Sequence, residues 1–274
     1  MDLYTKNAYQ LAELLTKNYS TSFSLSSRLF KRTIRPHIYA IYGMVRIADE
    51  IVDTYAGEDS EEKLHAFERE VIQELEIDTP FSTNPIVHAF AHTAKQFDIT
   101  KELVEPFFAS MRMDLTKTTF TNDEYNAYIY GSAEVVGLMC LRVFVNGDSE
   151  RYEQLKVGAQ KLGSAYQKVN FLRDIAADFS ERGRYYFPVG TFDLFDDTIK
   201  QQIISDIEAD FAEASKSVER LPRSAKKAVR MSVTYYKRLL SILNKTSSSE
   251  LKKRRFRVPT AQKAGLLAKG ILGL

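Results

Sequence analysis

Hydrophobic residues recur at helical spacing along most of this chain. Between residues 149 and 179, one apolar stripe is formed by Tyr152, Leu155, Ala159, Leu162, Tyr166, Val169, Ile175 and Phe179. The same periodicity predicts helices over residues 4–18, 33–56, 60–76, 84–96, 101–117, 122–146, 149–179, 194–220, 223–245 and 260–272. Clusters of turn-forming residues separate these segments. We therefore predict an all-α fold, a helical bundle that forms one domain over residues 1–274.

Composition adds a few constraints on the class of protein, its partners and its compartment. The 274 residues include 12 Gly and 7 Pro, few helix breakers for this length, and the net charge of +2 is too balanced to indicate a nucleic-acid partner. The single cysteine, Cys140, excludes an intramolecular disulfide and fits a reducing cytosol. The N-terminus lacks the pattern of a signal peptide, and no run of about 18 apolar residues predicts a membrane span. We expect a cytoplasmic protein.

Polar residues interrupt the apolar pattern at two places that carry the same motif. The first is Arg46-x-x-Asp49-x-x-x-Asp53, and the second is Arg173-Asp174-x-x-x-Asp178. Residues four apart share one face of a helix, about 6 Å from each other, so the two carboxylates of each pair repel. Their apolar neighbours indicate burial, and buried carboxylate pairs need cations such as Mg²⁺, which prefers oxygen ligands. One such motif is usually a solvated helix face, but two copies with nearby arginines favour a metal site.

A row of polar side chains extends the second motif toward the N-terminus. Gln167 and Asn170 precede Asp174 and Asp178 at the spacing of one helix face. Amide side chains set among apolar neighbours need hydrogen-bond partners. This row therefore predicts the wall of a cavity, and we expect the two motif helices to face each other across it.

These motifs resemble those of the squalene/phytoene synthase family. The resemblance spans the chain and rests on the two aspartate motifs and on four further segments: Arg184-Tyr185-Tyr186-Phe187-Pro188, the helix Tyr128–Gly137, Tyr19-Ser20-Thr21-Ser22-Phe23, and, typical of phytoene synthases, Met113-Asp114-Leu115 with Arg257-Val258-Pro259-Thr260. Three positions depart from the family pattern. Glu50 replaces a frequent Asp, Ala177 replaces an acid found in many members, and Glu134 replaces a small residue.

The resemblance implies a type I isoprenoid-synthase fold and a prenyltransferase. Two geranylgeranyl diphosphates would condense head to head, through a cyclopropyl (prephytoene) diphosphate, to phytoene in carotenoid biosynthesis, with Mg²⁺ or Mn²⁺ and without NADPH. A squalene or dehydrosqualene synthase acting on farnesyl diphosphate is the alternative within the family. A non-catalytic helical scaffold is the alternative of another class, but it should have lost part of one motif, and both are intact.

The resemblance also assigns roles to individual residues. The implied metal ligands are Asp49, Asp53, Asn170, Asp174 and Asp178. The implied substrate-binding residues are Tyr19, Ser20, Thr21, Ser22, Tyr42, Arg46, Gln167, Asn170, Arg173 and Tyr236. Tyr128 is the implied proton acceptor or relay, although a core tyrosine with a backbone partner is an equally good interpretation. For residues 19–22 the alternative is a helix N-cap or a turn.

The C-terminal segment has a different character. The basic run Lys252-Lys253-Arg254-Arg255-Phe256-Arg257 precedes an apolar-leaning stretch, residues 264–272. This pattern predicts an amphipathic helix for which an anionic membrane surface is a suitable partner. A tail that docks on its own domain is the alternative.

His88 and His92 have a spacing that can bind zinc, but we expect an ordinary surface helix face there.

Overall fold

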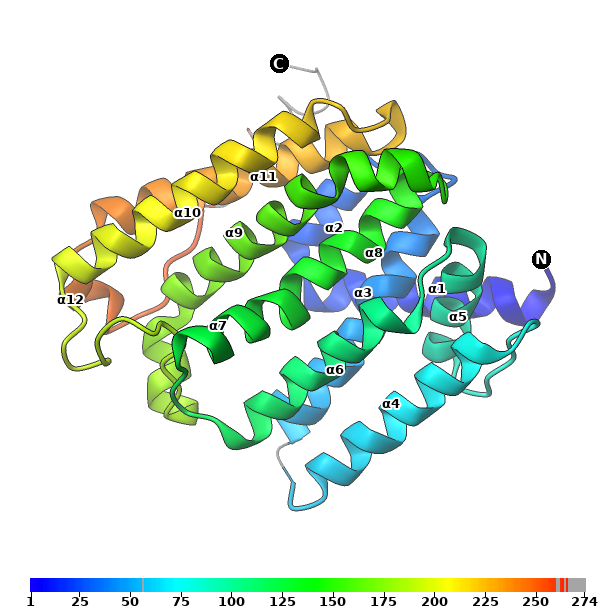
Figure 1. The fold of residues 1–274 in the computed structure, drawn as a ribbon, viewed down its shortest axis with the longest axis horizontal. Helices are drawn as coiled ribbons and strands as arrows, with labels where there is room; N and C mark the ends of the chain where they lie inside the picture. Colours follow the sequence, from blue (N-terminus) through cyan, green and yellow to red (C-terminus); the bar gives the residue numbers. More distant parts are fainter. Residues whose placement is uncertain (56, 260–261, 264, 266–274) are drawn as a thin grey trace.

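The computed structural model describes residues 1–55, 57–259, 262–263 and 265, and Figure 1 shows that helices account for almost all of its regular structure. The α-helices are α1 (Leu3–Tyr19), α2 (Thr21–Ser27), α3 (Arg35–Asp49), α4 (Ser60–Glu76), α5 (Pro85–Phe97), α6 (Lys101–Thr116), α7 (Asn122–Ile129), α8 (Val135–Phe144), α9 (Ser149–Arg182), α10 (Asp197–Val218), α11 (Arg223–Lys245) and α12 (Ser248–Leu251). The all-α prediction is confirmed.

The longest helix, α9, organises the bundle. It has 34 residues, which corresponds to about 50 Å. The Asp148 carboxylate caps its start by accepting from the Arg151 backbone N–H at 3.0 Å, and Gly183 ends it with a positive φ of 65°. Helices α8, α10 and α11 all pack against it (Figure 1). The second aspartate motif therefore lies near the carboxyl end of a central, well-anchored helix.

Several predicted boundaries were wrong for local reasons. The predicted helix 33–56 is α-helical only over α3 and continues as a π-helix, Glu50–Tyr55, and the predicted helix 122–146 is interrupted by a second π-helix, Tyr130–Glu134. Two short helices, α2 and α12, were not predicted, because their serine-rich sequences resemble turns. The predicted helix 260–272 lies largely outside the described residues.

Two large hydrophobic clusters form the core. The first is built around α3–α6 and α8, and the second around α9–α11; Leu162 and Val233 pack against both.

The helical segment from Asn122 to Phe144 is long and apolar enough to cross a membrane by length and composition alone. The sequence analysis did not predict this feature. Here it packs between α6 and α9, where Gly131 allows close contact with the Pro106 carbonyl.

The histidine pair also differs from the prediction. His88 is 2% exposed, and its Nε2 lies 2.9 Å from the Thr5 hydroxyl. Its ring is tilted against that of His92, with 4.6 Å between ring centres. His88 therefore helps to hold α1 against α5, instead of lying on a solvated helix face.

Candidate active site

Asp174 in the second motif is held by two arginines. Its neighbour Arg173 donates from Nε to Oδ1 at 2.9 Å. Arg255, which follows α12 and is 81 residues away in sequence, donates from Nη2 to Oδ2 at 3.2 Å, and its Nε lies 2.7 Å from Oδ1. The sequence analysis had placed Arg255 in a membrane-binding cluster, and the structure instead brings it to the site.

Asp178, one turn further along α9, has a different environment. Its closest cation is Arg182, with 3.6 Å between the guanidinium and the carboxylate. Desolvation and the charge of Asp174 raise the pKa of Asp178 to about 7, against the opposing effect of Arg182. This carboxylate therefore lacks a cation close enough to stabilise its charged form.

The first motif lies where α3 changes into a π-helix. Arg46 forms an ion pair with Glu50, and it reaches Asp49 only at 3.8 Å. Burial raises the pKa of Asp49 to about 7, with Arg46 opposing and Asp53 adding to the shift. Asp53 instead contacts two arginines.

Those two arginines connect the motifs. Asp53 Oδ1 lies 3.3 Å from Arg182 Nε and 3.1 Å from the Arg184 guanidinium. Because Arg182 also contacts Asp178, one guanidinium bridges the two motifs. The two motifs therefore lie next to each other, joined by Arg182, which the sequence analysis did not name, and by Arg184, to which it gave no role.

A buried acid that the sequence analysis did not assign, Asp114 on α6, lies behind the first motif. It accepts hydrogen bonds from Tyr128 at 2.7 Å and Tyr186 at 2.9 Å, and Arg184 lies 3.5 Å away. Burial raises the pKa of Asp114 to about 6 despite Arg184. In the sequence it was quoted only within Met113-Asp114-Leu115, as part of the resemblance, and was given no role. Tyr128 is thus buried with a carboxylate partner, not a backbone partner, and its own pKa is raised by burial.

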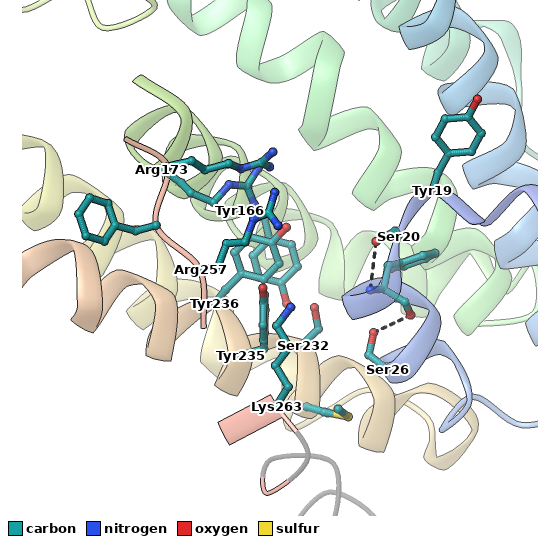
Figure 2. Close-up of a pocket in the computed structure, with 14 residues that line it drawn as sticks. Tyr19, Ser20, Ser26, Tyr166, Arg173, Ser232, Tyr235, Tyr236, Arg257 and Lys263 are labelled. Carbon is teal, nitrogen blue, oxygen red and sulfur yellow. Dashed lines mark hydrogen bonds between the residues drawn. The ribbon is translucent and has the colours of Figure 1, made fainter. Parts of the chain in front are cut away.

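Beside the second motif lies a pocket of about 450 Å³ with a cationic wall. Figure 2 shows the side chains of Arg173, Arg257 and Lys263 on one side, and Tyr19, Ser20 and Ser26 across from them. We call this pocket the cationic mouth. Four positive residues line it: Arg173, Arg255, Arg257 and Lys263. Such a wall suits a phosphate or diphosphate group.

An apolar cavity of about 330 Å³ adjoins the cationic mouth. Its walls come from α2, α3, α8, α9, α10 and α11. The two spaces share the lining residues Phe23, Ser26, Tyr166, Ser232 and Tyr236. Tyr166 and Tyr236 stack with 4.0 Å between ring centres, and Tyr236 donates to Asn170 Oδ1 at 3.4 Å. Together the two spaces fit an amphiphile with an anionic head and a long hydrocarbon chain.

The predicted substrate-binding residues are distributed over both spaces. Tyr19, Ser20 and Arg173 line the mouth, Tyr42, Gln167 and Asn170 line the apolar cavity, and Tyr236 lines both. Arg46 lies over the Tyr19 ring, 4.4 Å from its centre.

The serine-rich segment agrees with its simpler interpretation as a helix start. The Ser20 hydroxyl accepts from the Phe23 backbone N–H at 3.2 Å, so it caps α2 while also lining the mouth. Thr21 and Ser22 lie in the first turn of α2.

Glu134, one of the three departures from the family pattern, faces α9. There it accepts a hydrogen bond from Gln160 at 3.2 Å, and it does not belong to the cavity wall.

The acidic residues have the chemistry of ligands for a divalent metal. Among the described residues, no three His, Cys, Asp or Glu side chains converge to hold an ion by themselves. Mg²⁺ typically takes only one or two protein carboxylates and completes its shell with phosphate oxygens and water. Asp49 and Asp178 are hard oxygen donors with raised pKa values, so a nearby cation would stabilise their charged forms.

Solved structures with the same architecture define the class of fold. A dehydrosqualene synthase crystal structure superposes with a TM-score of 0.81 at 22% identity, covering 98% of this chain and 97% of the other. A squalene synthase from Alicyclobacillus acidocaldarius gives 0.78 at 21% identity, covering 93% and 98%. At these identities the likeness establishes the helical isoprenoid-synthase fold alone.

Sequence comparison is more specific. The squalene/phytoene synthase family model matches residues 16–262, and the chain belongs to that family. A phytoene synthase from Arthrospira platensis is 33% identical over 204 residues, 70% of this chain and 64% of that protein. A 4,4'-diapophytoene synthase from Staphylococcus haemolyticus is 30% identical over 201 residues, 72% and 68%. A 15-cis-phytoene synthase from Synechocystis is 27% identical over 284 residues, 94% and 82%. The chain thus matches just under two thirds of the Arthrospira protein, and the relatives' names indicate a prenyltransferase of the phytoene synthase kind.

Proposed function

We propose that this protein condenses two geranylgeranyl diphosphates head to head, through prephytoene diphosphate, to phytoene, and releases diphosphate. The observation that carries the proposal is the cationic mouth opening onto the apolar cavity through five shared residues. The mouth suits the diphosphate, and the cavity suits the prenyl chain. Carotenoid biosynthesis would be the corresponding pathway.

Asp49, Asp53, Asn170, Asp174 and Asp178 would hold Mg²⁺ or Mn²⁺. The metal would neutralise the negative charge that develops on the departing diphosphate. Arg173, Arg255 and Arg257 would bind phosphate oxygens, because planar guanidinium groups make paired hydrogen bonds to them. Arg173 and Arg255 hold Asp174 in the absence of substrate, so they would exchange this carboxylate for phosphate.

The apolar cavity would protect the carbocations that follow ionisation. Its aromatic and aliphatic lining excludes water, which would otherwise capture the cation. Tyr128 lies buried between Asp114 and the aromatic ring of Phe171, with 5.7 Å between ring centres. Tyr128, with Asp114 as the acceptor of its hydroxyl proton, would receive the proton lost when the cyclopropane ring closes.

The extent of the cavity supports the longer substrate. Along α9 its lining runs from Leu155 to Asn170, a separation of about 22 Å at the helical rise per residue. An extended C20 prenyl chain can be accommodated over this length. The competing proposal is farnesyl diphosphate as the substrate, which the name of the staphylococcal relative, 4,4'-diapophytoene synthase, favours.

The deciding experiment offers the purified protein each diphosphate separately, with Mg²⁺ in detergent, and identifies the extracted hydrocarbon by mass. A C40 product from geranylgeranyl diphosphate, formed faster than any C30 product from farnesyl diphosphate, is expected. The reverse preference would establish the dehydrosqualene alternative. Absence of any product from either substrate, with both intact motifs and a folded protein, would favour the non-catalytic scaffold. NADPH should change neither product nor rate.

We further propose a cytoplasmic protein that attaches peripherally to a membrane, because a hydrocarbon product is insoluble in water. Residues of the basic cluster 252–257, which was predicted to contact a membrane, make contacts within the protein instead. Arg255 and Arg257 line the mouth, and Lys252 donates to the Asp193 carbonyl at 3.1 Å. Most of the predicted amphipathic helix lies outside the described residues. Its role at a membrane remains a prediction.

A further inference from the structure

Positive charge is concentrated in two segments that contain no acidic residue. No Asp or Glu occurs between Glu13 and Asp49, or between Glu219 and Glu250. The first segment carries Lys17, Arg28, Lys31, Arg32, Arg35 and Arg46, and the second carries Arg220, Arg223, Lys226, Lys227, Arg230, Lys237, Arg238 and Lys245. Because the whole chain has a net charge of only +2, the remainder is acidic on balance.

The fold brings these two segments together. The Lys31 backbone N–H donates to the Ser224 carbonyl at 3.0 Å, and α2 packs against α11. Five exposed cations gather around this junction, and we call them the α2–α11 face: Arg28, Lys31, Arg32, Arg223 and Lys227.

The cations of the α2–α11 face have no acidic partners. Within the described parts of the chain, none of the five forms an ion pair. Glu219, the acid that directly precedes the second segment, is occupied by Arg230, whose Nε lies 2.8 Å from Oε1. Arg35 is used internally, since it donates to the Arg28 and Phe30 carbonyls at 2.7 and 2.9 Å and so fixes the loop that displays Arg28 and Lys31.

The apolar cavity lies directly under this face. The segment of α2 and its following loop contributes Phe23, Ser26 and Phe30 to the cavity lining. Helix α11 contributes Ala228, Val229 and Ser232. Phe30 sits between Arg28 and Lys31 in sequence, and Val229 follows Lys227 by two residues. The cationic surface and this part of the cavity wall are therefore both made by α11 and by α2 with the loop that follows it.

We propose that the α2–α11 face docks onto an anionic lipid bilayer and that the hydrocarbon product leaves the cavity between α2 and α11. The docking stands on the charge distribution, whereas the exit route rests on the proposed function. Lipid is favoured over a polynucleotide because an apolar cavity backs the cations, and because Leu11 and Leu14 are exposed on α1, which packs against α2. A polynucleotide would interact with the cations alone and would not use the apolar cavity or the exposed leucines.

The test measures binding of the full-length protein to vesicles of phosphatidylcholine and phosphatidylglycerol in a two-to-one ratio, and to vesicles of phosphatidylcholine alone. The parent should bind the anionic vesicles, and binding should weaken as salt is raised. The R28E/K31E/R32E variant should bind at least about 100-fold more weakly, since each cation near an anionic surface contributes on the order of fivefold and each new Glu is repelled by the surface. The variant should keep the parent's melting temperature and its turnover in detergent.

A matched variant, R69E/K95E/K101E, makes the same change in net charge on exposed positions of α4, α5 and α6. It should bind within about twofold of the parent. Equal losses in both variants would show that net charge alone acts, and unchanged binding of R28E/K31E/R32E would show that another surface docks; either overturns the proposal. So would tighter binding of the parent to a DNA duplex than to the vesicles. Missing turnover in detergent with intact vesicle binding would reject the proposed function and the exit route while retaining the docking face.

Discussion

The two aspartate motifs have the same spacing in sequence but opposite internal arrangements. In the first, Asp53 is held by Arg182 and Arg184 while Asp49 is left with a distant arginine. In the second, the leading residue, Asp174, is held by two arginines, and the trailing Asp178 has the weaker partner. The first motif also spans the change from α-helix to π-helix, whereas the second lies on regular α-helix.

This difference shows that each motif contains one neutralised carboxylate and one that still needs a cation. Burial raises the pKa of both Asp49 and Asp178 to about 7. A metal that enters with a diphosphate would therefore find one unsatisfied carboxylate on each side of the site. Asp53 and Asp174, which contact arginines, would become metal ligands once those arginines bind the diphosphate.

Substitution of single carboxylates should give the largest loss of turnover. Asp49→Asn and Asp178→Asn should each lower turnover about 100- to 1,000-fold, because each removes charge that stabilises the bound metal. Neither should lower the melting temperature, since the charged forms are already disfavoured. Asp174→Asn should lower turnover similarly and also cost about 2 kcal/mol of stability, because two arginines lose a charged partner. Steady-state rates and thermal unfolding test this, and a uniform loss of stability across all three variants would contradict the comparison.

Arginine-to-lysine changes should have an intermediate effect. Arg173→Lys keeps the positive charge but loses the planar pair of donors, so kcat/KM should fall by about tenfold or more. Arg182→Lys, between the two motifs, should behave similarly because Lys cannot contact Asp53 and Asp178 with one rigid group. The measurement is made at low substrate concentration. An Arg173→Lys enzyme that matches the parent there would show that the two-pronged contact has no role.

The tyrosines on Asp114 separate proton transfer from positioning. Tyr128→Phe should lower turnover about 100-fold or more if its hydroxyl takes part in proton transfer. Tyr186→Phe removes the other hydrogen bond to the same carboxylate and serves as the matched control. If both variants lose the same activity, Tyr128 only positions Asp114, which in turn holds Arg184 near Asp53.

The pH dependence of metal-free stability tests the two carboxylates whose pKa values are raised. Asp49 and Asp178 have a reference pKa of 3.8 when unfolded and about 7 when folded, so the folded state binds more protons between these values. Stability without metal should therefore fall as pH rises from about 4 to 7, and Mg²⁺ should weaken the trend. Thermal unfolding with a chelator, compared with an Asp49→Asn/Asp178→Asn variant, measures this contribution. Parent and variant curves that stay parallel over this range would mean that neither carboxylate titrates as described.

Helical periodicity was sufficient to predict the class of fold, because apolar stripes must be buried whatever their neighbours are. The predicted second motif helix, 149–179, corresponds closely to α9. The π-helices at Glu50–Tyr55 and Tyr130–Glu134 were not predictable, since they depend on packing against other helices rather than on local preference. For the same reason the arginine partners of the aspartates were missed: Arg184 is 131 residues from Asp53, and Arg255 is 81 residues from Asp174.

The sequence by itself determined the helical class, the two acidic motifs and the family to which the chain belongs, because these depend on residue type and spacing. Only the tertiary structure decided which aspartate in each motif is neutralised, that Asp114 and Tyr128 form a buried pair, and that Arg255 faces the site. The physical reason is that charge and burial depend on distances in space. The pKa of a carboxylate depends on nearby cations and on burial, and the helices that bury these carboxylates, together with Arg184 and Arg255, come from segments distant in the chain.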